Sequence, residues 1–260
     1  MSIGTFFHVV SSEWLKQRRS LALPVVIGSA CFVPAIIFLS RFRQIDALPA
    51  LHRAPRFWEG LWRQSWEAMA LMILPMAIML LASLLAQVEY RSNAWKQVHA
   101  APVPLTIVFA AKLTVLLTLV AALIACFNAG IYMSAALPAV LFSSVPMPAA
   151  PDVRYFAARD LRFFVDALPI VALQFVLAIV FRSFLTPLGI GMAMWIFSVG
   201  TLSWRHSWIV PYSAATLDYL KVEYQRTLAL PASPSVIAGG YFFVFTVVGF
   251  VIYARKRDRG

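Results

Sequence analysis

The sequence QVEYRSNAWKQVHAAPVP, residues 87–104, is the richest polar interruption between two long apolar runs of the chain. Its polar side chains surround a tryptophan and are followed by two prolines: Glu89, Arg91, Asn93, Trp95, Lys96, Pro102 and Pro104. A short charged helix held at a membrane face would suit contact with a soluble partner. A simple hydrophilic turn between two membrane spans would have a similar composition, so the segment alone leaves both readings open.

Composition places the chain among membrane proteins. Of its 260 residues, 61% are hydrophobic and 13% are charged, whereas soluble domains carry about 25% charged residues. The net charge of +11 would indicate nucleic-acid binding in a soluble protein. Here the basic residues flank apolar runs, where they orient a membrane protein and contact anionic headgroups. We therefore expect membrane lipid, and no nucleic acid, among its partners.

Apolar runs of about 20 residues are long enough to cross the hydrocarbon layer. The sequence predicts six spans, at about 21–40, 66–86, 105–130, 163–181, 185–203 and 235–254. Before them, residues 1–20 form an amphipathic helix lying in the membrane interface, with Ile3, Phe7, Val10 and Trp14 on one stripe. Glu13, Lys16 and Gln17 lie off that stripe. The expected architecture is all-α and polytopic, with residues 1–260 forming a single transmembrane domain.

The apolar run that begins at Leu105 continues to about residue 145, enough for two spans. With an extra span in 127–145 the chain would have seven spans, and its two basic ends would lie on opposite sides. With one long span followed by an interfacial segment containing Pro138, both ends share a side. Basic residues concentrate on the cytoplasmic side of membrane proteins, which favours six spans and two cytoplasmic termini.

Two aromatic-rich connections are expected to lie at the opposite membrane face. The first, 41–64, is typical of an interfacial loop with a short re-entrant or surface helix, anchored by Trp58, Trp62 and Trp66. The second, 204–234, is the longest loop, and its aromatic residues indicate seating at the interface: Trp204, Trp208, Tyr212, Tyr219 and Tyr224.

No constellation for catalysis stands out in the sequence. No glycine is followed by Lys-Ser or Lys-Thr, so a phosphate-cradling loop for ATP is absent. The four histidines lack the spacing of metal ligands. Glu67 and Asp166 fall near one end of their predicted spans and Lys112 near the other, which argues against an ion-coupled carrier. We expect no catalytic residue, cofactor or metal.

Three local signals together carry a family resemblance: EWLKQRRS at 13–20 before the first span, EYRSNAWKQVHAAPVP at 89–104, and FRSFLTPLGIG at 181–191. They resemble the permease subunit of type-2 ABC transporters, the group that includes bacteriocin and lantibiotic immunity permeases. The resemblance covers nearly the whole chain. The long run beyond residue 105 departs from it.

The resemblance implies a dimeric six-span subunit in the bacterial inner membrane, paired with a second permease and with ABC ATPase subunits that hydrolyse ATP. It further implies that residues 1–20 and a coupling helix in 87–104 contact the ATPase. The matching positions are Glu89, Arg91, Asn93, Lys96 and Pro102 in that segment, with Glu13 and Lys16 in the N-terminal helix. The expected cargo of this exporter is an amphipathic, peptide-like or lipid-like compound. The alternative is a stand-alone membrane carrier or a structural assembly factor without an ATPase.

Overall fold

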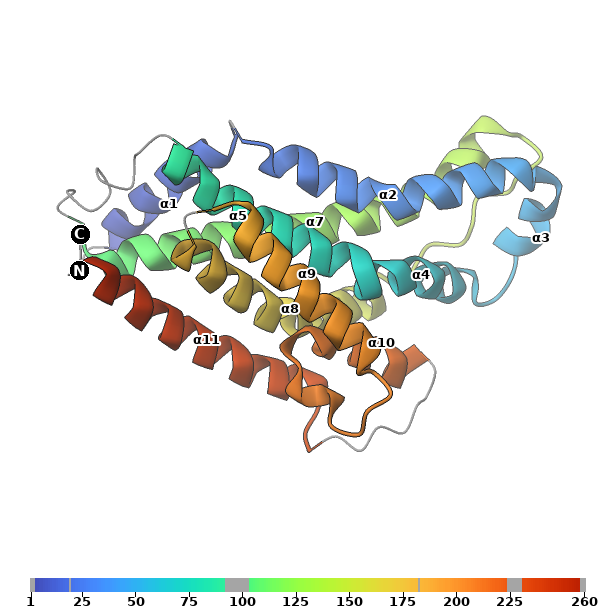
Figure 1. Cartoon of the computed structure of the whole chain (residues 1–260). Coiled ribbons are helices and arrows are strands. Elements are labelled where there is room, and N and C mark those ends of the chain that lie inside the picture. Colours follow the sequence, from blue (N-terminus) through green and yellow to red (C-terminus); the bar gives the residue numbers. More distant parts are fainter. Residues whose placement is uncertain (1–2, 19, 92–102, 182, 224–230, 258–260) are drawn as a thin grey trace.

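The computed structural model describes residues 3–18, 20–91, 103–181, 183–223 and 231–257. Within these ranges all regular elements are helical, and the long helices run side by side along one axis (Figure 1). Helix α1 (Ile3–Arg18) and the end of α11 (Pro234–Arg257) lie at the same end of the bundle, which we call the termini end. Helices α3 (Leu48–His52) and α10 (Ala214–Glu223) lie toward the other, the distal end.

Five helices are long and apolar enough to cross a membrane. They are α2 (Ala22–Arg43), the continuous helix made of α4 (Phe57–Ala68), the π-helical turn η2 (Met69–Ile73) and α5 (Leu74–Arg91), then α7 (Leu105–Leu141), α8 (Val153–Val180) and α11. The predicted all-helical membrane architecture is confirmed. The sixth predicted span, 185–203, corresponds to α9 (Leu185–Gly200), whose 16 residues measure about 24 Å against about 30 Å of hydrocarbon.

Helix α7 resolves the long apolar run from Leu105. It is one unbroken helix of 37 residues, about 55 Å long, so residues 127–141 form neither an extra span nor a separate interfacial segment. Pro138 lies in its last turn, where its carbonyl accepts the Phe142 N–H. Helix α2 packs along α7, and Gly130 allows the approach: a Cβ there would lie 2.9 Å from Pro34 Cγ.

Two helices begin well before the predicted spans. The second predicted span was expected from residue 66, but its helix starts at Phe57, so 41–64 is not mainly an interfacial loop. The fourth was expected from residue 163, but α8 starts at Val153. Asp152 supplies its N-cap, since its side chain accepts the N–H groups of Arg154 and Tyr155 at 3.1 and 3.2 Å. This capping satisfies backbone donors that have no partner inside the helix.

The predicted interfacial anchoring by tryptophans is wrong for two of the three residues. Trp62 and Trp66 are 3% and 0% exposed, and the Trp66 ring stacks on Phe163 with centroids 4.3 Å apart. These rings fill the space between α4 and α8 at the distal end, where apolar burial outweighs seating among headgroups. Trp58 is half-buried, stacks on Tyr132 and donates its indole N–H to the Ala149 carbonyl.

The described part of the segment 204–234, residues 204–223 and 231–234, is largely helical turns packed on the bundle and not an open loop. It contains two 3₁₀ turns, η3 (Ser207–Ile209) and η4 (Pro211–Ser213), followed by α10. Tyr212 and Tyr219 are fully buried: Tyr212 accepts a hydrogen bond from the Gln174 side-chain amide, and Tyr219 donates to the Arg63 carbonyl at 3.0 Å. Their expected interfacial seating is therefore wrong, whereas Trp204 is half exposed and Tyr224 lies outside the described residues.

Substitution of Gly191 tests the tight contact of α9 with α5 and α8. A Cβ at Gly191 would lie 2.0 Å from Gln174 Nε2 and 2.6 Å from Met79 Sδ, so Gly191→Ala must displace the amide that bonds Tyr212. We expect overpacking of about 1–3 kcal/mol and a thermal midpoint in detergent lowered by roughly 3–10 °C. Gly189→Ala is the matched control, since nothing lies within 4 Å of its added Cβ. Equal midpoints for the two variants would contradict the packing.

Candidate functional site

The termini end brings together parts of the chain that are far apart in sequence. Helix α1, the end of α5, the start of α7 and the end of α11 all lie there (Figure 1). Helix α1 packs along α7 and also contacts α2 and α5. Residues 92–102, between α5 and α7, lie outside the described residues, whereas the end of α5 and the start of α7 both lie at this end.

A buried ion pair fixes α1 to the bundle. The Lys112 ammonium lies 3.0 Å from Glu13 Oε2, and the two side chains are only 4% and 5% exposed. The other carboxylate oxygen of Glu13 accepts from Lys16 at 2.7 Å, where the lysine is 27% exposed. Lys112 stands about two turns into α7, so the contact joins the N-terminal helix to a long membrane helix.

The face that α1 turns to the bundle differs from the predicted stripe. Glu13 and Gln17, expected off the stripe, are the most buried described residues of the helix at 4% and 1% exposure. Phe7, expected on the apolar stripe, is 64% exposed, whereas Val10 and Trp14 are half-buried against the core. Lys112 explains this orientation of α1. A cation inside an apolar helix requires a counter-charge, and the observed face of α1 places Glu13 beside it.

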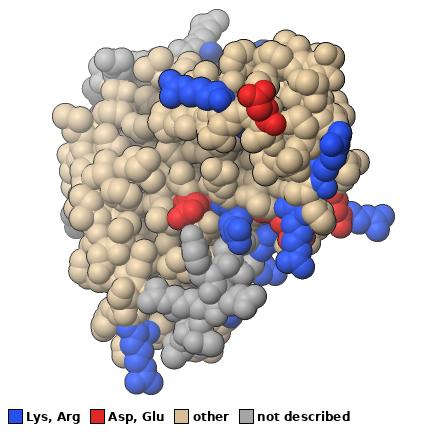
Figure 2. Space-filling model, turned by 90° about the vertical axis from the view of Figure 1, so that its right-hand side faces the viewer, with Lys and Arg blue, Asp and Glu red and all other residues tan. Residues whose placement is uncertain are grey.

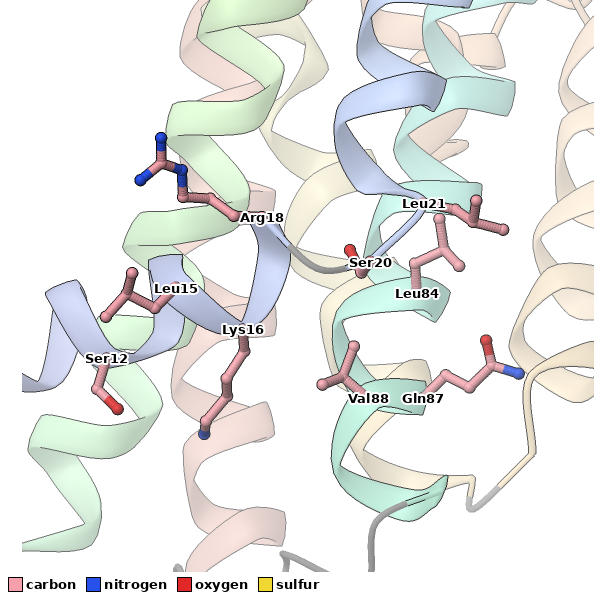
Figure 3. Close-up of a pocket in the computed structure, with 9 residues that line it drawn as sticks. All are labelled: Ser12, Leu15, Lys16, Arg18, Ser20, Leu21, Leu84, Gln87 and Val88. Atoms are coloured by element: carbon pink, nitrogen blue, oxygen red, sulfur yellow. The ribbon is translucent and has the colours of Figure 1, made fainter.

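A groove of about 1010 Å³ opens between α1 and the end of α5 (Figure 3). Lys16 and Arg18 contribute positive charge from α1, and Gln87 contributes an amide from α5. Around them the groove is lined by hydroxyl and apolar side chains: Ser12, Leu15, Ser20, Leu21, Leu84 and Val88. No acidic side chain is among these described lining residues. The groove is thus an amphipathic, basic surface beside the point where α5 leads into the connection.

The predicted site residues divide into three groups. Glu13 and Lys16 meet in one ion pair at the termini end, but only Lys16 lines the groove. Glu89 and Arg91 belong to the last turns of α5. Asn93, Lys96 and Pro102 lie outside the described residues. The predicted site residues did not include Arg18, Gln87 or Lys112, the ion-pair partner of Glu13. The sequence signal for Lys112 was a lone lysine within an apolar run.

A second polar cluster lies toward the distal end. Asp166 is 0% exposed in α8 and lies beside Asp218 of α10 and Ser235 at the start of α11. Burial raises the pKa of Asp218, against the opposing effect of Arg162 and other nearby cations. Because α8 begins at Val153, Asp166 stands mid-helix, yet its neighbour Ser235 marks the start of the adjacent membrane helix. The described residues include no group of three or more potential metal ligands.

Comparison with family models gives one match, to the ABC-2 family transporter protein, over residues 9–198. The match spans well over half of the chain and includes α1, the groove and the helices through most of α9. The chain belongs to the ABC-2 transporter family. No curated protein and no solved structure matches it.

Membership in the ABC-2 family makes this chain the membrane subunit of an ABC transporter, a multi-pass permease that functions with an ABC ATPase. ABC-2 permeases are in general transport subunits, with ATP hydrolysis on the partner chain. The narrower similarity to bacteriocin and lantibiotic immunity permeases stays a prediction.

Removal of the Glu13 charge tests the attachment of α1 in the ABC-2 permease. Glu13→Gln leaves the Lys112 ammonium beside a neutral amide at a nearly inaccessible position, which we expect to cost about 1–3 kcal/mol. The thermal midpoint of the purified protein should fall by roughly 3–10 °C. Lys16→Gln is the matched control: it breaks the more exposed half of the same network, worth about 0–1 kcal/mol. A loss as large in Lys16→Gln as in Glu13→Gln would refute the assignment.

Proposed function

We propose that this ABC-2 permease is the membrane half of an ATP-driven exporter in the bacterial inner membrane. Two permease copies, or a pair of related permeases, would form the pathway for an amphipathic, peptide-like or lipid-like cargo. In each copy, α9 makes the sixth crossing and both termini are cytoplasmic. The observation that carries this proposal is the basic groove at the termini end, next to the helix that leads into the segment 87–104.

The ATPase docks, in this proposal, on the termini end. Its contacts are the segment 87–104, through Glu89, Arg91, Asn93, Lys96 and Pro102, and the exposed side of α1 around Lys16. The groove supports this location because Arg18 and Lys16 offer charge and Leu15 offers an exposed apolar side chain on one helix. Such a mixture is typical of surfaces that bind soluble proteins without being obligate hydrophobic interfaces.

Glu13 contributes to the proposed coupling from inside the bundle. Its side chain is 5% exposed, which favours transmission of force from α1 over direct contact with the ATPase. A push on α1 reaches α7 through the ion pair with Lys112, and a push on the segment 87–104 reaches α5 and α7 through the backbone. The two routes converge on α7, the longest helix described, which extends to the distal end. Closure of the ATPases would thereby reorient the helices and alternate the access of the pathway.

The proposed chemistry of the cargo follows from the side chains in the core of the bundle. The bundle core is apolar and aromatic, and the buried charged groups of the described residues lie toward its two ends. Glu13 and Lys112 lie toward one end, and Arg41, Asp166 and Asp218 lie toward the other. A pathway through such a bundle would suit a compound with extended apolar surface better than a small hydrated ion.

Charge reversal in the coupling segment tests the proposal. The permease, with or without Arg91→Glu plus Lys96→Glu, is co-expressed with its cognate ABC ATPase and purified through a tag on the permease. We expect the double variant to recover at least about tenfold less ATPase, since reversing two rim charges replaces attraction with repulsion.

The matched control is Arg43→Glu plus Arg53→Glu, which reverses two exposed charges at the ends of α2 and α3 and should leave ATPase recovery unchanged. Equal recovery from the wild type and the Arg91/Lys96 variant, with ATP-dependent transport intact, would reject the docking site. Transport by the purified permease without any ATPase would instead support the stand-alone carrier and reject the exporter.

A further inference from the structure

A pocket of about 570 Å³ lies at the distal end, where α2 ends and α4 begins. Arg41 and Arg56 bring positive charge to it, and Gln64 brings an amide. The remaining lining is apolar or small: Leu51, Ala54, Pro55, Phe57, Gly60 and Leu61. The pocket is thus basic on one part of its wall and apolar on the rest, with no acidic side chain among these residues.

Arg41 is the unusual member of this lining. It is 8% exposed, and its guanidinium makes one long hydrogen bond, from Nη1 to the Ser134 carbonyl at 3.4 Å. Its Cζ also lies 5.0 Å from the centre of the Phe57 ring. Among the described residues, no carboxylate lies within ion-pair distance of Arg41. A guanidinium has five N–H donors and a large desolvation penalty, so a buried one without a counter-ion is stabilised by an anion that reaches it.

Two further features add positive potential at the same place. Helix α4 starts at Phe57 without a side-chain cap, although the Phe57 N–H donates to the Ala54 carbonyl at 3.2 Å. The positive end of the α4 dipole lies at the pocket. Arg56, exposed and directly before the helix, also lines the pocket. The one acidic residue of this first turn, Glu59, is exposed and does not line it.

His52 does not compete for an anion. Its Nδ1 lies 2.8 Å from the Pro146 carbonyl, and burial lowers the pKa of the ring, with the Arg41 charge lowering it further. A neutral His52 leaves the local charge to the arginines. The end-on view of the distal face shows basic side chains outnumbering acidic ones across it (Figure 2).

We propose that this pocket binds the anionic headgroup of a membrane phospholipid, with the phosphate held between Arg41, Arg56 and the start of α4. A phosphate offers several acceptor oxygens, which suit the forked donors of two arginines, and its negative charge suits the positive end of the α4 dipole. The location favours a lipid over a soluble anion because the pocket stands at the end of two candidate membrane spans, Ala22–Arg43 and Phe57–Val88. Leu51, which lines the pocket, is 46% exposed and offers an acyl chain an apolar surface beside the arginines.

This inference does not depend on the proposed export function or on the ATPase. It assigns the lipid a structural role as well: the phosphate would bridge the end of α2 to the start of α4, at the hairpin that closes the distal end. The bound lipid should therefore raise thermal stability in addition to being retained.

The number of phospholipids that stay bound to the purified protein tests the site directly. The full-length protein in detergent is titrated with phosphatidylglycerol or phosphatidylcholine, and bound lipid is counted by native mass spectrometry alongside the thermal midpoint. We expect one phosphatidylglycerol to bind preferentially and to raise the midpoint. Arg56→Gln and Arg41→Gln should each weaken that binding by about tenfold or more, because each removes charge-assisted hydrogen bonds to the phosphate.

Arg53→Gln is the matched control, since Arg53 is exposed on the same connection and does not line the pocket. Arg56 is exposed and outside the core, so its variant keeps the test valid if Arg41→Gln does not fold. Equal retention of both lipids, or equal losses in Arg53→Gln and Arg56→Gln, would overturn the site.

Competition by glycerol phosphate as strong as that of the whole lipid would overturn the lipid assignment and indicate a site for a small soluble anion. Competition by dodecanoate stronger than by phosphatidylglycerol would indicate a carboxylate cargo site and would equally reject it.

Discussion

A hydrocarbon layer offers no hydrogen-bond partner to a peptide group, and this constraint accounts for the main features of the fold. A helix satisfies its backbone within the segment, so every described regular element of the chain is helical. The same constraint allows irregular backbone only where protein covers it or where water reaches it. The η3 and η4 turns meet the requirement by packing beneath α10, with Tyr212 and Ser213 buried and hydrogen-bonded.

The helices differ widely in length, and several of them exceed the thickness of the hydrocarbon layer. Helix α7 is about 55 Å long and α8 about 42 Å, against about 30 Å of hydrocarbon, whereas α9 is about 24 Å. In Figure 1, α2 and α3 extend well beyond the start of α11. The extended part is held by aromatic packing around Trp62, Trp66 and Phe163. The distal end is therefore a packed helical region and not a set of loops.

Apolar length and charge placement predicted the fold class and most helices, because a membrane helix must be apolar over nearly all of its length. They failed where protein contacts replace lipid contacts. Trp62, Tyr212 and Tyr219 have the composition of interfacial anchors, but the energy of burying them against α8 and α4 depends on partners distant in sequence. Helix starts were missed for a related reason: residues 153–162 are charged, so hydropathy excludes them, whereas the Asp152 cap and α8 packing keep them helical.

The candidate site shows the same limit at a single residue. Sequence position placed Glu13 in the right segment, but periodicity placed it on the wrong face of α1, because a hydrophobic stripe takes no account of a charge on another helix. Lys112 reverses the expectation: burying the pair together costs less than burying either charge alone. The consequence is mechanical. An interfacial helix held only by apolar contacts can slide along the membrane surface, whereas one fixed by a directional ion pair keeps its register with α7. In the proposed coupling mechanism, a displacement of α1 therefore either moves α7 or breaks the buried charge pair.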